Sequence, residues 1–310
     1  MELLRRQLTD AGFEVAQHMV SDEVPVRSLE ASAQMMASMA DAGLTSDDLM
    51  VIAGDVDALS LSSYVCGQWC GGIPLVMVPT TQTALVEAPV TPRGIDVGGR
   101  EQMLTLRPAV KHVLFDMGVG LRQEVDEDTM MARVMMVVTA MCDSESTFSR
   151  LWDRTEALCA GDLEALCEQL RDTVKTRGKI LSSTALALRQ SLTYGESVAE
   201  ALMRLVDGLA PSTARAEALR FQARLAAGEG MFEVDDVLAQ DELLESLGLP
   251  ILQADVDPEA LIATVREVRF EHSNRFLLGL PRKLGRVRLA AVSDELIAEH
   301  VAAWCESRRA

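Results

Sequence analysis

Residues 49–56 read LMVIAGDV, a short apolar run from Leu49 to Ala53 that ends in Gly54 and Asp55. An apolar run of this length that stops at a glycine is typical of a buried parallel strand. The pattern returns at 74–79 (PLVMVP) and at 110–115, and residues 60–70 carry a helical pattern between the first two runs. Strand, helix and strand at this spacing predict a parallel sheet with crossover helices.

The rest of the chain separates into two parts with different periods. Helical patterns cover 2–11 and 29–42, and Phe13–Val15 is expected to form a short strand. From about Glu124 the apolar period becomes 3.6 and stays there. The sequence therefore predicts an α/β domain over 1–120 and a helical domain over 121–310. In the second domain we expect a hairpin at 275–280 and 286–290, and helices at 126–142, 147–159, 162–176, 183–192, 197–209, 213–226, 234–247, 258–267 and 293–306.

Composition excludes several classes of protein. The chain has 310 residues, with 29 Lys plus Arg against 47 Asp plus Glu, and a formal net charge of −18. So acidic a chain repels phosphate backbones and anionic lipids, so we expect no nucleic-acid and no membrane partner. Hydrophobic residues make up 48%, enough for a substantial core. No apolar run approaches the roughly 20 residues of a membrane span, and no signal peptide is recognised, which predicts a cytoplasmic protein.

Cysteine and histidine show no metal-binding or disulfide pattern. The six cysteines are too sparse for a disulfide scaffold, and the four histidines are scattered. Cys66 and Cys70 lie one helical turn apart with no second pair at ligand spacing, so we interpret them as small core residues. The methionines between 130 and 141 are interpreted as adaptable core side chains.

Several stretches resemble, in order along the chain, motifs of the dehydroquinate synthase family and its sugar-phosphate cyclase relatives. LMVIAGDV resembles the strand before that family's triple-glycine turn. Gly72-Ile73-Pro74 with Val78–Thr81 resembles its G-I-P…V-P-T-T segment, which is the most specific match. Further similar stretches are Arg107–Val110 with Phe115-Asp116, Tyr194–Ala199, Leu247–Pro250 and Arg275–Leu278.

The resemblance covers nearly the whole chain and implies an α/β + α fold. Its parts would be an N-terminal Rossmann-like parallel-sheet domain and a C-terminal all-helical domain. The family's first strand has no counterpart, because residue 1 already falls in its first helix. The resemblance also implies a small-molecule substrate in a cleft between the domains, and the family's dimers suggest a homodimer.

The family's zinc ligands, one Glu and two His, are replaced. Arg133 stands at the place of the Glu, Ser183 at the place of the first His, and Tyr194 at the place of the second. A guanidinium, a hydroxyl and a neutral phenol do not hold a divalent ion as carboxylate and imidazole do. We therefore expect no metal.

The NAD motif departs from the family pattern as well. The triple glycine that lets backbone approach the pyrophosphate reads Gly54-Asp55-Val56, so Asp55 adds a negative charge there. The family's next Asp falls near Ser60, and its G-E-x-x-K element appears as Glu23–Arg27, one residue out of register. These changes predict that no cofactor is bound.

Substrate-binding positions are altered rather than lost. Arg93 replaces the Lys of the family's G-G-K-T-G-V-N loop, Arg100 that of its G-K-N, and Glu87 the preceding Asp. Arg93 and Arg100 are either ligands for an anion or solvated loop residues. Glu87 and Asp96 are either a tunable acid–base pair or surface partners of these arginines.

The replaced zinc positions leave alternatives too. Arg133, on a methionine-rich helix, is either a substrate clamp or one half of an internal salt bridge, because a buried cation needs a partner. Tyr194 either donates a hydrogen bond to a substrate or fills the volume of the missing metal, and filling is the preferred interpretation.

The resulting hypothesis is a family scaffold repurposed for metal- and NAD-independent enzyme chemistry of the cyclase or lyase type. We expect it in specialised-metabolite biosynthesis, by analogy with the family's relatives. Its candidate catalytic residues are Glu87, Arg93, Asp96, Arg100, Arg133 and Tyr194. The alternative is a non-catalytic pseudoenzyme that binds a small molecule or a partner subunit, and an authentic dehydroquinate synthase ranks last.

Overall fold

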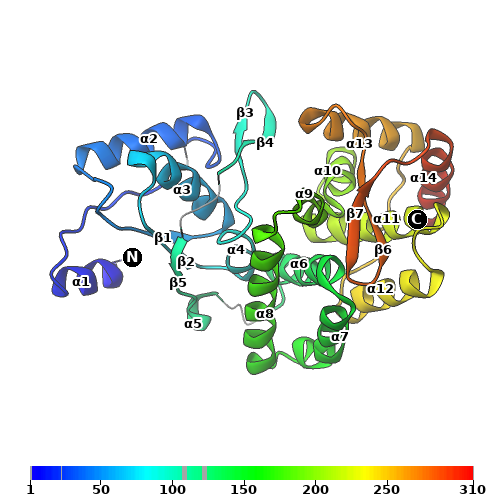
Figure 1. Cartoon of the computed structure of the whole chain (residues 1–310), viewed down its shortest axis with the longest axis horizontal. Helices are drawn as coiled ribbons and strands as arrows, with labels where there is room; N and C mark the ends of the chain where they lie inside the picture. The colour runs from blue at the N-terminus through cyan, green and yellow to red at the C-terminus, as the bar shows by residue number, and fades with distance from the viewer. Residues whose placement is uncertain (1, 22, 107–109, 121–123, 310) are drawn as a thin grey trace. The chain divides into compact units, whose positions relative to one another are not determined.

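The computed structural model of the chain describes residues 2–21, 23–106, 110–120 and 124–309. The chain divides into two compact units, Met1–Gln123 (unit 1) and Glu124–Ala310 (unit 2) (Figure 1). Residues 107–109, which carry part of the Arg107–Val110 motif, lie outside the described residues. No described helix is both long enough and apolar enough to cross a membrane.

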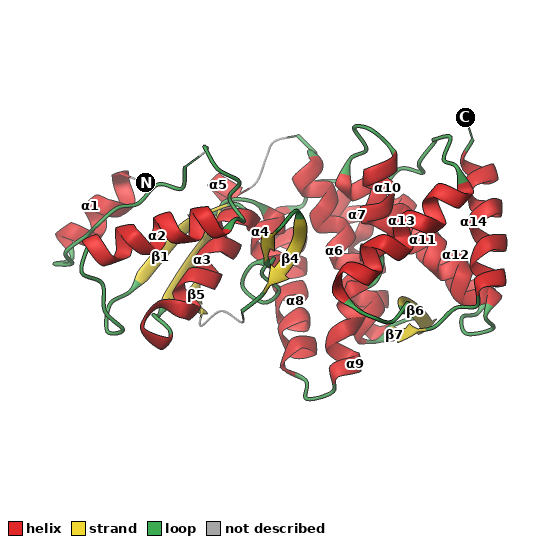
Figure 2. Ribbon diagram, turned by 90° about the horizontal axis from the view of Figure 1, so that it is seen from above, coloured by secondary structure: helices red, strands yellow, loops and turns green. Residues whose placement is uncertain are grey.

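Unit 1 is built on a three-stranded parallel sheet in the order β1-β2-β5 (Figure 1), and Figure 2 draws the strands in yellow. Its strands are β1 (Met50–Gly54), β2 (Leu75–Pro79) and β5 (Val110–Val113). The central strand β2 is buried except at Val78, as expected for a parallel strand covered on both faces. The parallel sheet predicted from the three apolar runs is confirmed.

The helices of unit 1 are α1 (Glu2–Asp10), α2 (Leu29–Asp41), α3 (Val56–Gln68), α4 (Gln82–Glu87) and α5 (Met117–Gly120). Met35 and Met39 of α2 pack with Leu59 and Val65 of α3 in one core cluster with the sheet. Helix α3 begins at Val56, earlier than the predicted Ser60, because the side chain of Asp55 caps it. The strand end and the helix start therefore adjoin directly.

Two details of unit 1 differ from the sequence-based expectation. A hairpin of β3 (Ile95–Val97) and β4 (Arg100–Leu104) was not predicted. Its two-residue turn is Gly98-Gly99, and both have the positive φ that such a turn requires. The strand predicted at Phe13–Val15 is wrong: this segment pairs with no strand, and Phe13 is 57% exposed. A strand needs a partner for its backbone groups.

Unit 2 is mostly helical, and α6 and α11 form its interior. Most residues of α11 are buried, which indicates a helix surrounded by others. A short 3-10 helix, Gln190–Thr193, follows α9 where one continuous helix was expected over 183–192. The helices are α6 (Glu127–Asp143), α7 (Glu145–Cys159), α8 (Leu163–Ser182), α9 (Leu186–Arg189), α10 (Glu196–Leu205), α11 (Pro211–Gly228), α12 (Val234–Ser246), α13 (Pro258–His272) and α14 (Asp294–Arg308).

The predicted hairpin of unit 2 is confirmed as β6 (Leu278–Lys283) and β7 (Arg286–Ala290), which pair antiparallel. Because of this pair, the expectation of an all-helical second domain is corrected to a helical domain with one hairpin. The turn lies close against the α6–α7 junction, since a Cβ on Gly285 would collide with the backbone of Ser144.

Candidate functional site

Arg133 lies on helix α6, and side-chain contacts hold the first turn of this helix in place. The side chain of Asp126 caps the helix by accepting a hydrogen bond from the Thr129 backbone N–H at 2.9 Å. The Glu127 carboxylate accepts hydrogen bonds from the backbone N–H and the hydroxyl of Ser212, at 2.6 and 2.7 Å. Ser212 lies in the first turn of α11, so Glu127 both caps α11 and joins it to α6.

Arg133 lies in the interior of unit 2 and is 8% exposed. Its Nη1 donates to the carbonyl oxygen of Leu247 at 2.7 Å, and its Nη2 donates to that of Leu158 at 3.4 Å. Leu247 terminates α12 and Leu158 lies in the last turn of α7, so both partners are the negative ends of helices. No ion pair to Arg133 occurs among the described residues, so the salt bridge, one of the two alternatives for this side chain, is absent there, and two helix ends supply its partners.

Tyr194 is fully buried, between the 3-10 helix and α10. Its hydroxyl lies 2.9 Å from Gln240 Oε1 and 3.0 Å from the carbonyl oxygen of Leu219, and Gln240 Nε2 donates to the same carbonyl at 3.2 Å. Burial raises the pKa of Tyr194 well above its ordinary value, although the Gln240 contact lowers it in part. Both polar contacts of the phenol are thus inside unit 2.

The third zinc position, Ser183, ends α8, and its hydroxyl accepts a hydrogen bond from the Ala185 backbone N–H at 3.2 Å. Arg133, Ser183 and Tyr194 thus offer one cation, one hydroxyl and one neutral phenol, which is no donor set for zinc. Over residues 2–21, 23–106, 110–120 and 124–309, no group of three or more His, Cys, Asp or Glu side chains is placed to hold a metal ion. Metal does not fit these residues.

The start of α3 is the place where a dinucleotide fold binds pyrophosphate through free backbone N–H groups. Here the Asp55 carboxylate accepts hydrogen bonds from the backbone N–H groups of Asp57 and Ala58, at 3.1 and 2.9 Å. A Cβ on Gly54 would stand 2.8 Å from that of Ala58, so strand and helix pack closely. Two of the first N–H groups of the helix are in use and the local charge is negative, so the pyrophosphate of NAD does not fit this helix start.

Glu87 and Arg93 are brought together at one end of α4. The Arg93 Nη2 donates to Glu87 Oε2 at 3.2 Å, and its Nη1 donates to Asp57 Oδ1 at 3.4 Å. Ser60 fixes the loop, because its hydroxyl accepts from the Arg93 backbone N–H at 3.0 Å and donates to the carbonyl of Val56 at 2.5 Å. The charge of Glu87 raises the pKa of Arg93 further, although burial opposes this.

Asp96 and Arg100 lie on the β3–β4 hairpin. Asp96 accepts a hydrogen bond from the Gln102 backbone N–H at 2.8 Å and lies 3.3 Å from Arg27 Nη1. Glu87 and Asp96 therefore contact different arginines and are linked through Asp57, which both arginines approach. The structure supports the interpretation of ion partners rather than of a direct acid–base pair. The Arg100 side chain is exposed on β4.

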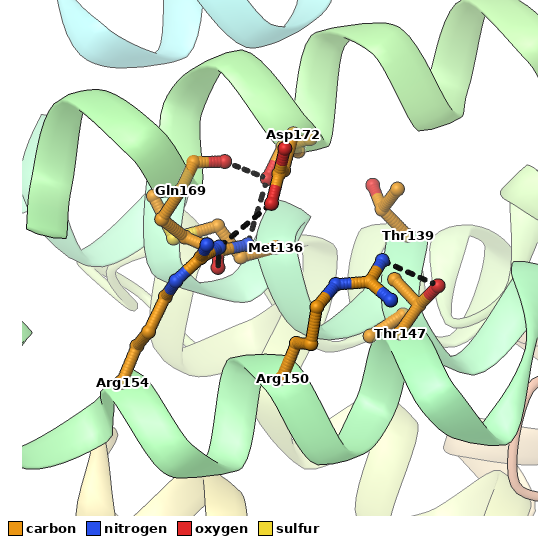
Figure 3. Close-up of a pocket in the computed structure, with 9 residues that line it drawn as sticks. Met136, Thr139, Thr147, Arg150, Arg154, Gln169 and Asp172 are labelled. Atoms are coloured by element: carbon orange, nitrogen blue, oxygen red, sulfur yellow. Dashed lines mark hydrogen bonds and ion pairs between the residues drawn. The ribbon is translucent and has the colours of Figure 1, made fainter.

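A small polar pocket between α6, α7 and α8 was not anticipated (Figure 3). It has room for about one water molecule. Figure 3 shows Arg154 directed at Gln169 and Asp172, which it contacts at 3.0 and 2.8 Å. Arg150 donates to the Thr147 hydroxyl at 3.2 Å. The pocket's polar groups thus contact one another, and scattered threonines in predicted helices are the only sequence signal for it.

A buried ion network in unit 2 was also missed. Glu217 on α11 is fully buried and accepts from Arg220 Nη1 at 2.9 Å and from Arg308 Nε at 2.8 Å. Trp304 Nε1 donates to the same carboxylate at 3.3 Å. Because Arg308 and Trp304 belong to α14, the network attaches the C-terminal helix to the core of unit 2. This network has a structural role, and it includes none of the candidate catalytic residues.

Comparison with known proteins gives sequence relatives along most of the chain. No family model matches it. The 3-dehydroquinate synthase of Corynebacterium jeikeium is 22% identical over 305 residues, which are 97% of this chain and 82% of the relative. That of Saccharopolyspora erythraea is 25% identical over 287 residues, which are 89% of this chain and 74% of the relative.

Solved structures show the same fold. The 2-epi-5-epi-valiolone synthase from Streptomyces hygroscopicus subsp. jinggangensis 5008, with NAD+ and Zn2+ bound, is 16% identical with a TM-score of 0.77, covering 99% of this chain and 89% of that one. A 2-deoxy-scyllo-inosose synthase complexed with carbaglucose-6-phosphate, NAD+ and Co2+ is 14% identical with a TM-score of 0.73, covering 93% and 82%. The chain is therefore similar over most of its length to curated 3-dehydroquinate synthases, and it has the fold of these two sugar-phosphate cyclase structures.

Proposed function

We propose that this chain is a repurposed member of the family, an enzyme that works without a divalent metal ion and without NAD. The observation that carries the proposal is the environment of Arg133. Its guanidinium stands where the resemblance puts a metal-binding carboxylate, and two helix ends hold it there. A divalent ion at this place would meet a fixed positive charge and would lack anionic ligands.

The start of α3 supports the proposal that the chain works without NAD. Asp55 uses the helix's first N–H groups, and Asp57 adds another carboxylate in the first turn. A pyrophosphate would have to displace one carboxylate and approach the other, which electrostatics disfavours. Chemistry without a hydride acceptor is redox-neutral, and eliminations and cyclisations of this kind need proton transfer rather than oxidation.

For such cyclase- or lyase-type chemistry we propose Glu87 as the group that moves a proton. Its side chain is 13% exposed, and that of its partner Arg93 is 26% exposed, so the pair borders solvent. Arg93 would orient the carboxylate through their 3.2 Å contact. Specialised biosynthesis is the proposed setting, by analogy with the structural neighbours, which are a 2-epi-5-epi-valiolone synthase and a 2-deoxy-scyllo-inosose synthase.

A second candidate function is a non-catalytic subunit that binds a small molecule or a partner protein. The burial of Tyr194 and the carbonyl contacts of Arg133 favour it, since both side chains are used inside unit 2. Under this alternative the inherited zinc position is only a structural core, and Glu87 and Arg93 are an ion pair that holds a loop.

Elemental analysis and NAD titration of the purified full-length protein test the cofactor proposal. We expect substoichiometric zinc, iron and cobalt, and no saturable change in fluorescence with NAD. Stoichiometric zinc or saturable NAD binding would contradict it.

Assays with candidate substrates, chosen from the functions of the neighbouring genes, distinguish the enzyme from the non-catalytic subunit. If the enzyme proposal holds, Glu87→Gln abolishes product formation, while the matched variant Glu145→Gln, on the exposed start of α7, leaves it intact. Binding of the same compounds without turnover in the unmodified protein identifies the non-catalytic class instead.

A further inference from the structure

Six charged side chains of unit 1 contact one another around the start of α3 and the β3–β4 hairpin. Two arginines meet four carboxylates there, at N–O distances of 3.2 to 3.7 Å. We call them the unit 1 ion cluster, and its members are Arg27, Asp57, Glu87, Arg93, Asp96 and Glu101.

Arg93 is the more accessible of the two arginines in this cluster. Its side chain is 26% exposed, twice the 13% of Arg27. A free guanidinium at such a place would be a strong receptor for phosphate, because its planar fork matches two phosphate oxygens. In this chain the two Nη atoms of Arg93 already face Asp57 Oδ1 and Glu87 Oε2.

The two carboxylates that face Arg93 occupy the places of a ligand's oxygens. A phosphate that approached Arg93 would have to displace Glu87 or Asp57, or remain beside them against like charge. Among the described residues the cluster has more carboxylates than cations, so its field repels anions as well. An uncharged hydroxyl compound meets neither obstacle, since it can donate hydrogen bonds to these carboxylates without a charge penalty.

We propose that Glu87 and Asp57 act as built-in anions that close Arg93 to phosphate, so that the candidate site of unit 1 takes an uncharged, hydroxyl-bearing compound instead of a phosphate ester. The proposal deepens the proposed function and rests on it only for the location of the site. It sets this chain apart from the structural neighbour whose complex contains carbaglucose-6-phosphate. Glu87 is then a determinant of specificity as well as the proposed proton carrier.

The test is a gain of phosphate binding, measured with inorganic phosphate on the full-length protein by calorimetry or by chemical-shift titration. The unmodified protein should bind phosphate weakly or not at all. Glu87→Gln removes one of the two charges that face Arg93, and we expect it to tighten phosphate binding on the order of tenfold. The double variant Glu87→Gln with Arg93→Gln should lose that gain, because the freed guanidinium is then absent.

Asp96→Asn is the matched control, because it removes the same charge from the same cluster but contacts Arg27 and not Arg93. We expect it to change phosphate binding by less than about twofold. Equal gains in Glu87→Gln and Asp96→Asn would overturn the proposal, and so would tight phosphate binding by the unmodified protein that Arg93→Gln abolishes. If Glu87→Gln does not fold, Asp57→Asn removes the other facing charge and gives the same readout.

This titration is independent of the test of the proposed function. Stoichiometric zinc or NAD binding would contradict the cofactor-free enzyme but would leave the phosphate gain of Glu87→Gln as it is. If Glu87→Gln does not tighten phosphate binding, the proposal that Glu87 and Asp57 exclude phosphate from Arg93 is contradicted, whereas the result of the elemental analysis is unaffected. The two failures are therefore distinguishable.

Discussion

The Arg133 guanidinium donates to the carbonyl oxygen of Leu247 at 2.7 Å, across 114 residues of sequence. This contact joins α6 to the end of α12, and the second contact, to Leu158, joins it to the end of α7. Three helices of unit 2 therefore meet at one buried cation. The charge is stabilised by peptide carbonyls at the negative ends of two helices rather than by an acid.

Replacement of Arg133 should destabilise unit 2. Arg133→Met keeps much of the side-chain volume but leaves the two carbonyl oxygens without their donor, which we expect to cost about 2 to 3 kcal/mol in the free energy of unfolding. Arg133→Glu should cost more, because a carboxylate would face the negative ends of two helices. Urea unfolding followed by circular dichroism measures both.

Arg100→Met, on the exposed strand β4, is the control for this prediction and should change stability by less than about 0.5 kcal/mol. A tighter metal affinity in Arg133→Glu without loss of stability would show that the position is still a metal ligand site and would contradict the interpretation.

Tyr194 gives a prediction about alkaline pH. Burial raises its pKa well above the ordinary value, so the folded state holds the phenolic proton more tightly than the unfolded state does. The stability from this group is therefore fully present below the unfolded pKa of about 10 and is lost as the pH rises above it. Tyr194→Phe should lower stability at pH 7 by about 1 to 2 kcal/mol, because Gln240 loses its partner.

The same variant should also reduce the fall in stability between pH 9 and pH 11, which melting temperatures measured across that range would show. Tyr64→Phe is the matched control, since Tyr64 is the other of the two tyrosines and is only half-buried. An equal pH dependence in the unmodified protein and in Tyr194→Phe would argue that the phenol ionises in the folded state.

The sequence predicted those parts of the fold that local patterns determine. The three parallel strands follow from apolar runs that end at turn residues, and α6 follows from an apolar stretch behind an Asp cap. The β3–β4 hairpin was not predicted because its strands are short. All residues of β4 are exposed, so its sequence shows no alternation of apolar and polar residues. The first turn of α3 was placed late because the capping role of Asp55 was not recognised.

The candidate site was predictable as a set of positions but not as a set of contacts. Arg133 was correctly expected to need a partner, yet backbone carbonyls have no signature in sequence and lie far along the chain. The contact of Glu87 with Arg93 spans six residues and was among the expected alternatives, whereas the contacts of Asp57 with Arg27 and Arg93 were not expected. Long-range ion pairs depend on tertiary packing, as Glu217 with Arg308 also illustrates.

The six cysteines should fall into two reactivity classes. Burial raises the pKa of Cys66 and Cys142 to about 12, and it raises that of Cys305 as well, so these thiols stay protonated at pH 8. Cys70, Cys159 and Cys167 are exposed. Because the thiolate is the nucleophile, iodoacetamide at pH 8 should label the three exposed residues in the folded protein and all six in urea.

Intact-mass spectrometry counts the adducts, and peptide mapping locates them. Modification of Cys142 in the folded protein, at a rate close to that of Cys159, would show that the interior near Tyr194 opens to solvent and would contradict the packing described for unit 2.

Asp55 should stabilise α3 and at the same time oppose dinucleotide binding. Asp55→Ala removes the acceptor for the N–H groups of Asp57 and Ala58, so we expect a loss of about 1 kcal/mol in stability. Asp55→Ser keeps a capping oxygen without the charge, so its free energy of unfolding should fall by only about 0.3 kcal/mol. Neither variant should bind NAD in a fluorescence titration, because Asp57 still places a carboxylate in the first turn. A stability loss in Asp55→Ser as large as in Asp55→Ala would mean that the charge, acting on the helix dipole, matters more than the hydrogen bonds.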